Sequence, residues 1–247
     1  MGLVIMSRAS IRKAHRWLGL IFSLSILTSA GSGILHNVMT YTQAPPPPAR
    51  PSGGGLAVER IAVPVAEVIA KLSLEDVQAV NVRGIDAEPW YQVFTGSGDR
   101  PVYVSAVDGR IDPLQDELYA AQIASAFLGG AKVRKAGYLT AFDKEYINIF
   151  RVLPVYRFDS DDTVGNRVYV STTTGSVTRH TDDKRQLEAN IFTNFHKLGF
   201  IPNKLARDTV LTLLTLGAFI VACLGIILFF ATSPLWGKSR GSEKDNP

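Results

Sequence analysis

Two long stretches of the chain contain almost no charged side chain. Residues 17–39 carry no acid or base apart from His36, and residues 209–236 contain no ionisable group apart from Cys223. A helix of about 20 apolar residues crosses the ~30 Å hydrocarbon core of a bilayer and satisfies its own backbone hydrogen bonds there. The pattern therefore predicts transmembrane helices at 17–39 and 207–232. The first could instead be a cleaved signal peptide, but its long apolar run without a small-x-small cleavage site favours an anchor.

Between these stretches, the spacing of apolar positions predicts short helices and strands. Helical spacing of apolar residues occurs twice, in Val63–Leu72 and Glu117–Leu128. Strand-like runs occur four times, in Val77–Val82, Tyr91–Phe94, Val133–Leu139 and Leu153–Phe158. Leu118, Ile123, Ala124 and Phe127 are predicted to share one face of the second helix.

An internal repeat divides this central region. The segment Pro101–Ile111 recurs as Arg167–Val177, and each copy reads V-Y-V-S before a glycine, Gly109 or Gly175, that predicts a tight hairpin turn. We therefore expect an α+β domain built from two units, 56–115 and 116–186, each with one helix and a small antiparallel sheet.

Two further segments connect this domain to the predicted membrane helices. Residues 40–55 contain the run QAPPPPARPSGGG, whose prolines and glycines predict a linker with a stiff part and a flexible joint. Residues 187–203 carry enough apolar surface to lie as an amphipathic segment in the membrane interface, supplied by Ile191, Phe192, Phe195, Leu198 and Phe200.

The charge distribution predicts the orientation of the chain. Residues 1–16 contain Arg8, Arg12, Lys13 and Arg16 without an acid, and the tail at 233–247 carries Lys238, Arg240 and Lys244. By the positive-inside rule both termini are expected in the cytoplasm of a bacterium, with the domain in the periplasm. Residues 41–203 hold 17 Lys+Arg against 19 Asp+Glu and no cysteine. That balance gives no basic patch for nucleic acid, and the missing cysteines are compatible with a periplasmic location without disulfides.

Several motifs resemble one family of membrane proteins. Residues 12–20 read R-K-A-H-R-W-L-G-L, and residues 194–200 read N-F-H-K-L-G-F before Arg207-Asp208 and the last apolar stretch with its Gly225. The helix-then-hairpin units ending in V-Y-V-x-x-x-x-G-x-[VI] resemble PepSY domains. Over nearly the whole length, the chain resembles the PepSY-associated transmembrane family, which is related to ferric-siderophore reductases. The resemblance implies b-type haem held between membrane helices. Some relatives have four such helices, against two predicted here.

Three of the four histidines stand at the predicted membrane borders. His15 lies at the cytoplasmic edge of the first helix, His36 at its outer edge, and His196 on the outer side ahead of the second helix. At 1.5 Å and 100° per residue, His15 and His36 are ~31 Å apart along the axis and only ~60° apart around it. Neutral imidazole binds haem iron, so we expect His36 and His196 to be the ligands of one iron. His15 could ligate only by pairing with its counterpart in a homodimer.

The histidines also have interpretations that involve no cofactor. A border histidine can simply be solvated among lipid headgroups, and His180 is predicted to be a surface residue at a strand end. Small residues accompany the border histidines and allow another helix or a flat ligand to approach closely, namely Ser25, Ser29, Ser32 and Gly33 on the first helix and Ala218, Ala222 and Gly225 on the second.

The sequence lacks motifs for most other chemistries. It contains no G-x-G-x-x-G, P-loop, H-E-x-x-H or C-x-x-C pattern, so a redox role needs an outside electron donor such as quinol. We expect an inner-membrane haem protein that moves electrons toward a periplasmic ferric chelate, as a reductase or its haem subunit. The rival hypothesis is a non-enzymatic, membrane-tethered PepSY module that binds a peptide, a protease or another envelope protein at a sheet edge.

Overall fold

The computed structural model forms two compact units. One combines Met1–Gln43 with Leu187–Pro247, and the other is Ala44–Gln186. The structure describes residues 7–43, 45, 47–50, 56–71, 76–96 and 100–233. Residues 1–6, part of the predicted linker at 40–55, and the predicted cytoplasmic tail beyond residue 233 lie outside the described residues.

The first unit contains two long apolar helices, α1 (Arg8–Thr42) and α5 (Lys204–Thr232). Both are long and apolar enough to cross a membrane by length and composition. Large apolar side chains face outward along both of them, such as Leu24, which is 71% exposed, and Phe219, which is 65% exposed. Exposed apolar surface of this extent is unfavourable in water and suits a lipid environment. These helices agree with the two predicted spans, although α1 begins nine residues earlier than expected.

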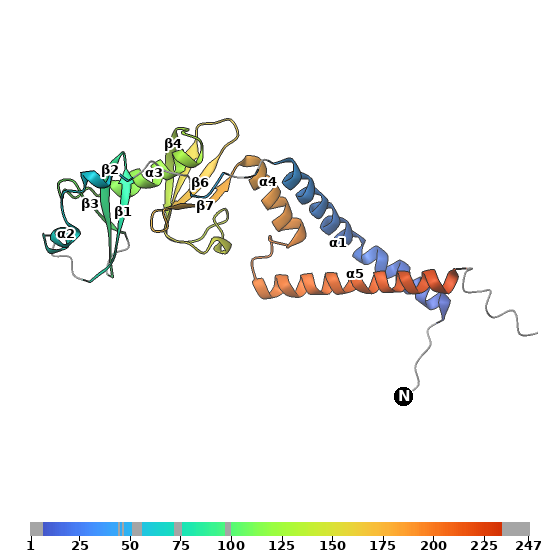
Figure 1. Cartoon of the computed structure of the whole chain (residues 1–247). Helices are drawn as coiled ribbons and strands as arrows, with labels where there is room; N and C mark the ends of the chain where they lie inside the picture. The colour runs from blue at the N-terminus through green and yellow to red at the C-terminus, as the bar shows by residue number, and fades with distance from the viewer. Residues whose placement is uncertain are drawn as a thin grey trace, which may run out of the picture. The chain divides into compact units, whose positions relative to one another are not determined.

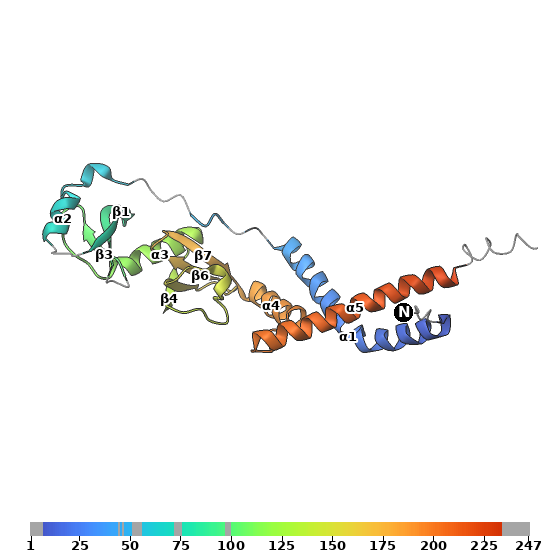
Figure 2. The same cartoon turned by 90° about the horizontal axis from the view of Figure 1, so that it is seen from below.

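The two long helices pack through interlocking glycines and rings. The Phe22 ring fills the space beside Gly217, where an added Cβ would lie 2.2 Å from ring carbons, and Gly19 lies against Val221. Figures 1 and 2 show α1 and α5 crossing, and the contacts of Gly19 and Phe22 lie in the N-terminal half of α1. Close approach through glycine is the usual way for helices to associate in lipid, where the hydrophobic effect gives little driving force.

A short helical segment packs against α1 beyond the crossing. It consists of α4 (Asp183–Ile191) and one π-helical turn, η3 (Phe192–His196), and Figure 1 shows it in the opening between α1 and α5. The chain then turns at Leu198, which has a positive φ of 50°, and Asn203 caps α5 by accepting a hydrogen bond from the Ala206 N–H. Leu187, Phe195 and Phe200 are more than half exposed, as the predicted amphipathic segment requires.

The second unit is an α+β domain with two antiparallel sheets. The first part contains a 3₁₀ turn η1 (Val58–Arg60), α2 (Val65–Lys71) and the sheet β1–β2–β3 (Val77–Ile85, Glu88–Thr95 and Val102–Ser105). The second part contains α3 (Gln115–Phe127) and the sheet β4–β5–β6–β7 (Val133–Leu139, Val155–Ser160, Arg167–Ser171 and Ser176–Thr181), with a 3₁₀ turn η2 (Asn148–Phe150) between β4 and β5. Each sheet is thus a meander that follows one helix along the chain.

The repeated sequence segments occupy equivalent strands but close differently. Tyr103 in β3 pairs with Gln92, and Tyr169 in β6 pairs with Arg157 at the same register position. The hairpin predicted at Gly175 is complete, because β6 pairs with β7. For Gly109, the prediction of a second strand is wrong. That strand is replaced by a single bridge between Val104 and Ile111. Asp112-Pro113 follows at once and α3 begins at Gln115, so no residues remain for a strand.

Helix α3 provides the centre of the domain core. One buried cluster joins Trp90 of the first sheet and Phe158 of the second to the α3 residues Ile123 and Phe127. Figure 1 accordingly shows α3 between the two sheets. Leu118 was predicted on the buried face but is 42% exposed, because Tyr119 and Ala120 face the core instead.

A buried carboxylate lies at the start of α3. Asp116 is 4% exposed and accepts hydrogen bonds from the Tyr103 hydroxyl at 2.9 Å and the Tyr156 hydroxyl at 2.8 Å. Gln92 donates to the Tyr103 oxygen at 2.7 Å and to the Thr172 carbonyl at 3.0 Å. Because buried polar groups are costly when unpaired, this satisfied network fixes both sheets to the same helix.

Candidate functional site

His36 is held by a carboxylate from the other end of the chain. Its Nδ1 lies 2.5 Å from Glu188 Oε1, and Gln43 Nε2 donates to Glu188 Oε2 at 3.0 Å. The Glu188 residue is 9% exposed, whereas the His36 side chain is 48% exposed. Since an ionised carboxylate can only accept, the proton of a neutral His36 ring resides on Nδ1.

His196 is held by two serines of α1. Its Nδ1 lies 3.2 Å from Ser32 Oγ and 3.4 Å from Ser29 Oγ. The Ser32 hydroxyl donates its only hydrogen to the Ser29 carbonyl at 2.9 Å, so Ser32 Oγ acts as the acceptor for His196 Nδ1–H. His196 ends the π-helical turn, a local widening that recurs at functional sites in proteins.

The Phe192 ring joins these two histidines into one aromatic cluster. It stacks on His196 with ring centroids 4.5 Å apart and planes 12° apart. It also contacts His36, with centroids 5.2 Å apart and an interplanar angle of 38°. The structure therefore brings His36 and His196 together at one end of α1, with separate hydrogen-bond partners and a shared aromatic neighbour.

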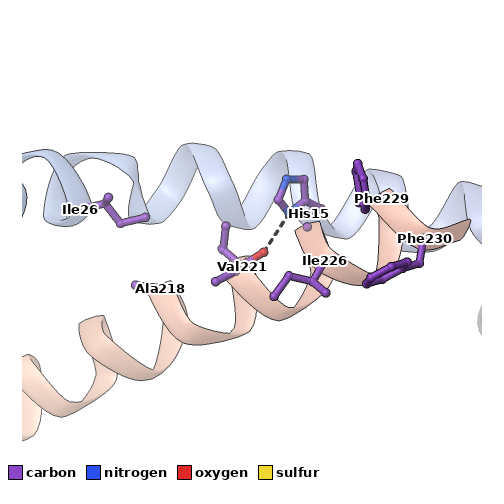
Figure 3. A pocket seen from close by; sticks show the side chains of 9 residues that line it. His15, Ile26, Ala218, Val221, Ile226, Phe229 and Phe230 are labelled. Atoms are coloured by element: carbon purple, nitrogen blue, oxygen red, sulfur yellow. Dashed lines mark hydrogen bonds between the residues drawn. The ribbon is translucent and has the colours of Figure 1, made fainter. Parts of the chain in front are cut away.

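His15 lies near the other end of α1, against α5. Its Nδ1 donates to the Val221 carbonyl at 3.1 Å, and its ring rests on Gly225, where an added Cβ would lie 3.2 Å from Cε1 (Figure 3). The ring lines an apolar groove of about 700 Å³, which is formed with Ile26, Ala218, Val221, Ala222, Gly225, Ile226, Phe229 and Phe230. This volume falls within the ~300–1,000 Å³ range of small-molecule sites.

The three border histidines share one arrangement. In each, Nδ1 is tied to an oxygen acceptor, and Nε2 has no hydrogen-bond partner among the described residues. In a neutral ring, this leaves the lone pair on Nε2 available. Metal-binding histidines are oriented in the same way, with the second nitrogen donating to a carboxylate, carbonyl or similar group.

The rest of the described chain offers no rival metal site. Within it, no group of three or more His, Cys, Asp or Glu residues is placed to hold a metal ion. Haem differs from a bare ion in this respect, because its macrocycle supplies four ligands and the protein supplies only the axial ones. A pair of histidines is therefore enough for the axial sites of haem.

His180 has a structural role in the domain. It lies in β7, where Nε2 is 2.8 Å from Asn166 Oδ1 and the ring meets Phe127 edge-on at 5.2 Å. Burial lowers the pKa of this imidazole. The predicted place at a strand end is confirmed, but the side chain is half-buried rather than exposed, because it packs against Phe127.

Sequence reasoning missed the groups that hold the border histidines. Glu188 lies four residues before Phe192 and eight before His196, so helical spacing alone places an acid on that otherwise apolar face. Ser29 and Ser32 were predicted only as small residues, whereas their hydroxyls contact His196. A backbone carbonyl such as that of Val221 leaves no signal in sequence at all.

The chain was compared with protein families, curated proteins and solved structures. No protein-family model, no curated protein and no solved structure matches the chain.

Proposed function

We propose that this chain is a haem-binding electron-transfer protein of the bacterial inner membrane, serving reduction of ferric chelates or iron uptake on the periplasmic side. The single observation that carries the proposal is the shared arrangement of His15, His36 and His196. All three present an Nε2 lone pair at the ends of two apolar helices while Nδ1 is held by an acceptor.

The residues fit the axial sites of haem in two respects. A hydrogen bond from Nδ1–H fixes the ring orientation and raises the basicity of Nε2, and a carboxylate acceptor such as Glu188 does so most strongly. The walls of the groove beside His15, including Phe229 and Phe230, are apolar and suit the faces of a haem macrocycle. When bound, haem supplies one-electron chemistry, and its potential depends on these ligands and on burial.

The proposal assigns the two ends of α1 to different ligands. His36 and His196 are the candidate pair at the outer end, within the Phe192 cluster. His15 is single in its groove and needs a partner, which the same residue of a second copy supplies in a homodimer. Two copies also bring the number of membrane helices to four.

The orientation of the chain belongs to the same proposal. The basic residues at the start of α1 favour a cytoplasmic N-terminus, which places His36, His196 and the α+β domain on the periplasmic side. There the resemblance to PepSY-associated membrane proteins supports a ferric chelate as electron acceptor, with a quinol in the bilayer as donor.

The test is haem content per chain in purified full-length protein. Wild-type protein is expected to carry haem, and His36→Ala, His196→Ala and His15→Ala are each expected to reduce the haem content. His180→Asn is the matched control, because that imidazole lies in the domain and contacts Phe127. Wild-type protein without haem, even after reconstitution, contradicts the proposal, as do three border variants that all retain the wild-type content.

A second candidate function rests on the sheets of the domain. Strands β1 and β4 end their sheets and, among the described residues, pair with a strand on one side only. A free strand edge can accept an extended peptide by strand addition, as expected of a tethered PepSY module that binds a peptide, a protease or another envelope protein. Function retained in a His36→Ala/His196→Ala double variant favours this alternative.

A further inference from the structure

Half of the twelve serine and threonine hydroxyls in the two long helices are satisfied by their own helix. Six of them donate to a carbonyl three or four residues earlier, namely those of Ser23, Thr28, Ser32, Thr42, Thr212 and Thr232. This bond hides the hydroxyl from lipid, where an unpaired polar group is costly.

Four hydroxyls have no hydrogen-bond partner among the described residues, those of Thr40 and Thr209 nearer the helix ends and those of Ser25 and Thr215 in the middle of the helices. Of these four residues, Ser25 and Thr215 line one cavity of about 410 Å³. The cavity lies between α1, α5 and the segment after α4, and Ser29 and His196 also line it. Two unpaired hydroxyls in the wall of one cavity between apolar helices offer hydrogen bonds to a ligand there.

The remaining walls of the cavity restrict the chemistry of that ligand. None of its twelve lining residues is Asp, Glu, Lys or Arg, so nothing balances the charge of a phosphate or carboxylate headgroup. Five of the walls are large apolar side chains, those of Ile26, Phe195, Leu198, Leu211 and Leu214. The ligand is therefore neutral and lipid-soluble, with polar atoms that can reach hydroxyls on both helices.

We propose that this cavity binds the ring of a quinone or quinol. Its ring carries oxygen atoms on opposite edges, which suits one hydrogen bond from Ser25 on α1 and one from Thr215 on α5, while the apolar walls receive the ring faces and the isoprenoid tail. The inference rests on the proposed function for its membrane setting and names the site of the electron donor. His196 lies in the wall, so the donor sits beside a proposed haem ligand.

His36 and Phe192 do not line this cavity, whereas His196 does. The two proposals are tested through different residues of one protein, because Ser25 and Thr215 belong to the quinone site and His36 belongs to the outer haem site.

The experiment measures binding of a short-tailed ubiquinone and a short-tailed menaquinone analogue to the full-length protein in detergent, by calorimetry on haem-free protein. Ser25→Ala and Thr215→Val each remove one hydrogen bond, and each is expected to weaken binding about tenfold. Ser23→Ala and Thr212→Val are matched controls on the same helices, because their hydroxyls bond their own carbonyls and do not line the cavity. The controls are expected to bind within about twofold of wild type.

Three outcomes overturn the inference. They are no binding of either analogue, equal binding by Thr215→Val and wild type, and equal weakening by the Thr212→Val control. Haem content measured on the protein as purified, before haem is removed for calorimetry, separates the two proposals. Haem without quinone binding refutes the quinone site alone, whereas quinone binding without haem in any preparation refutes the proposed function and leaves the quinone site standing.

Discussion

Replacing Asp116 with alanine should destabilise the α+β domain more than any single loss of one of its hydrogen bonds. The Asp116 carboxylate is the acceptor for two buried hydroxyls, those of Tyr103 and Tyr156, which are 1% and 2% exposed. Each buried donor left without an acceptor costs about 1–3 kcal/mol. Asp116→Ala should therefore lower the free energy of unfolding by about 2–6 kcal/mol, a large part of the ~5–15 kcal/mol that stabilises a typical domain.

A double-mutant cycle separates this mechanism from a general packing defect. Tyr156→Phe removes one hydrogen bond and should cost about 1–3 kcal/mol, because the bond is to a carboxylate. In the Tyr156→Phe background, Asp116→Ala leaves only the Tyr103 hydroxyl unpaired, so its cost should fall by about 1–3 kcal/mol. Coupling of this size is expected for residues in direct contact.

The assay is guanidinium unfolding of the full-length protein in detergent, followed by tryptophan fluorescence. Trp90 is 1% exposed in the domain core and reports on the domain when Trp17 and Trp236 are replaced by phenylalanine. If the m-values of the variants are equal, differences between their unfolding midpoints report differences in stability. The reasoning is refuted if Asp116→Ala costs no more than Tyr156→Phe, or if its cost is the same in both backgrounds.

Three further predictions concern helix packing, alkaline pH and the histidine cluster. Gly217→Leu should separate α1 from α5, because the leucine side chain would meet the Phe22 ring. The melting temperature should fall in this variant and stay at the wild-type value in the control Gly33→Leu, whose side chain would meet nothing within 4 Å. Burial raises the pKa of Tyr103 above its ordinary value near 10, so above pH 10 only the unfolded chain loses this proton. The free energy of unfolding should then fall by up to about 1.4 kcal/mol per pH unit, and less steeply in Tyr103→Phe, as unfolding curves between pH 9 and 11 would reveal. Glu188→Ala removes the hydrogen-bond acceptor of His36 and should weaken haem binding about 10–100-fold in a titration. An unchanged haem affinity would exclude this role for Glu188.

Elements with strong periodicity could be predicted from the sequence. The strand expected at Val133–Leu139 matches β4, and the two helices expected at 17–39 and 207–232 lie within α1 and α5. These succeed because a single local property, alternation or the absence of charge, decides the structure. The failed strand at Ile111 shows the limit, since Pro113 and the start of α3 left too little chain for the pairing that the repeat implied.

Polar groups with distant partners could not be predicted in the same way. Asp116 lies on the buried face of α3, yet its partner Tyr156 is 40 residues away, and an isolated acid in a helix is normally solvated. The Glu188 carboxylate that holds His36 is 152 residues along the chain from it. Such pairs depend on how remote segments pack, which no local pattern encodes. The border histidines themselves were found because ionisable residues are rare next to apolar spans.

The most direct test of the electron-transfer proposal is a reduced-minus-oxidised absorption spectrum of the purified full-length protein. The proposal predicts a Soret band that shifts on reduction and a sharp α-band, both weakened in His196→Ala and unchanged in His180→Asn. A protein that shows no Soret band in either state, including after incubation with haem, would contradict it.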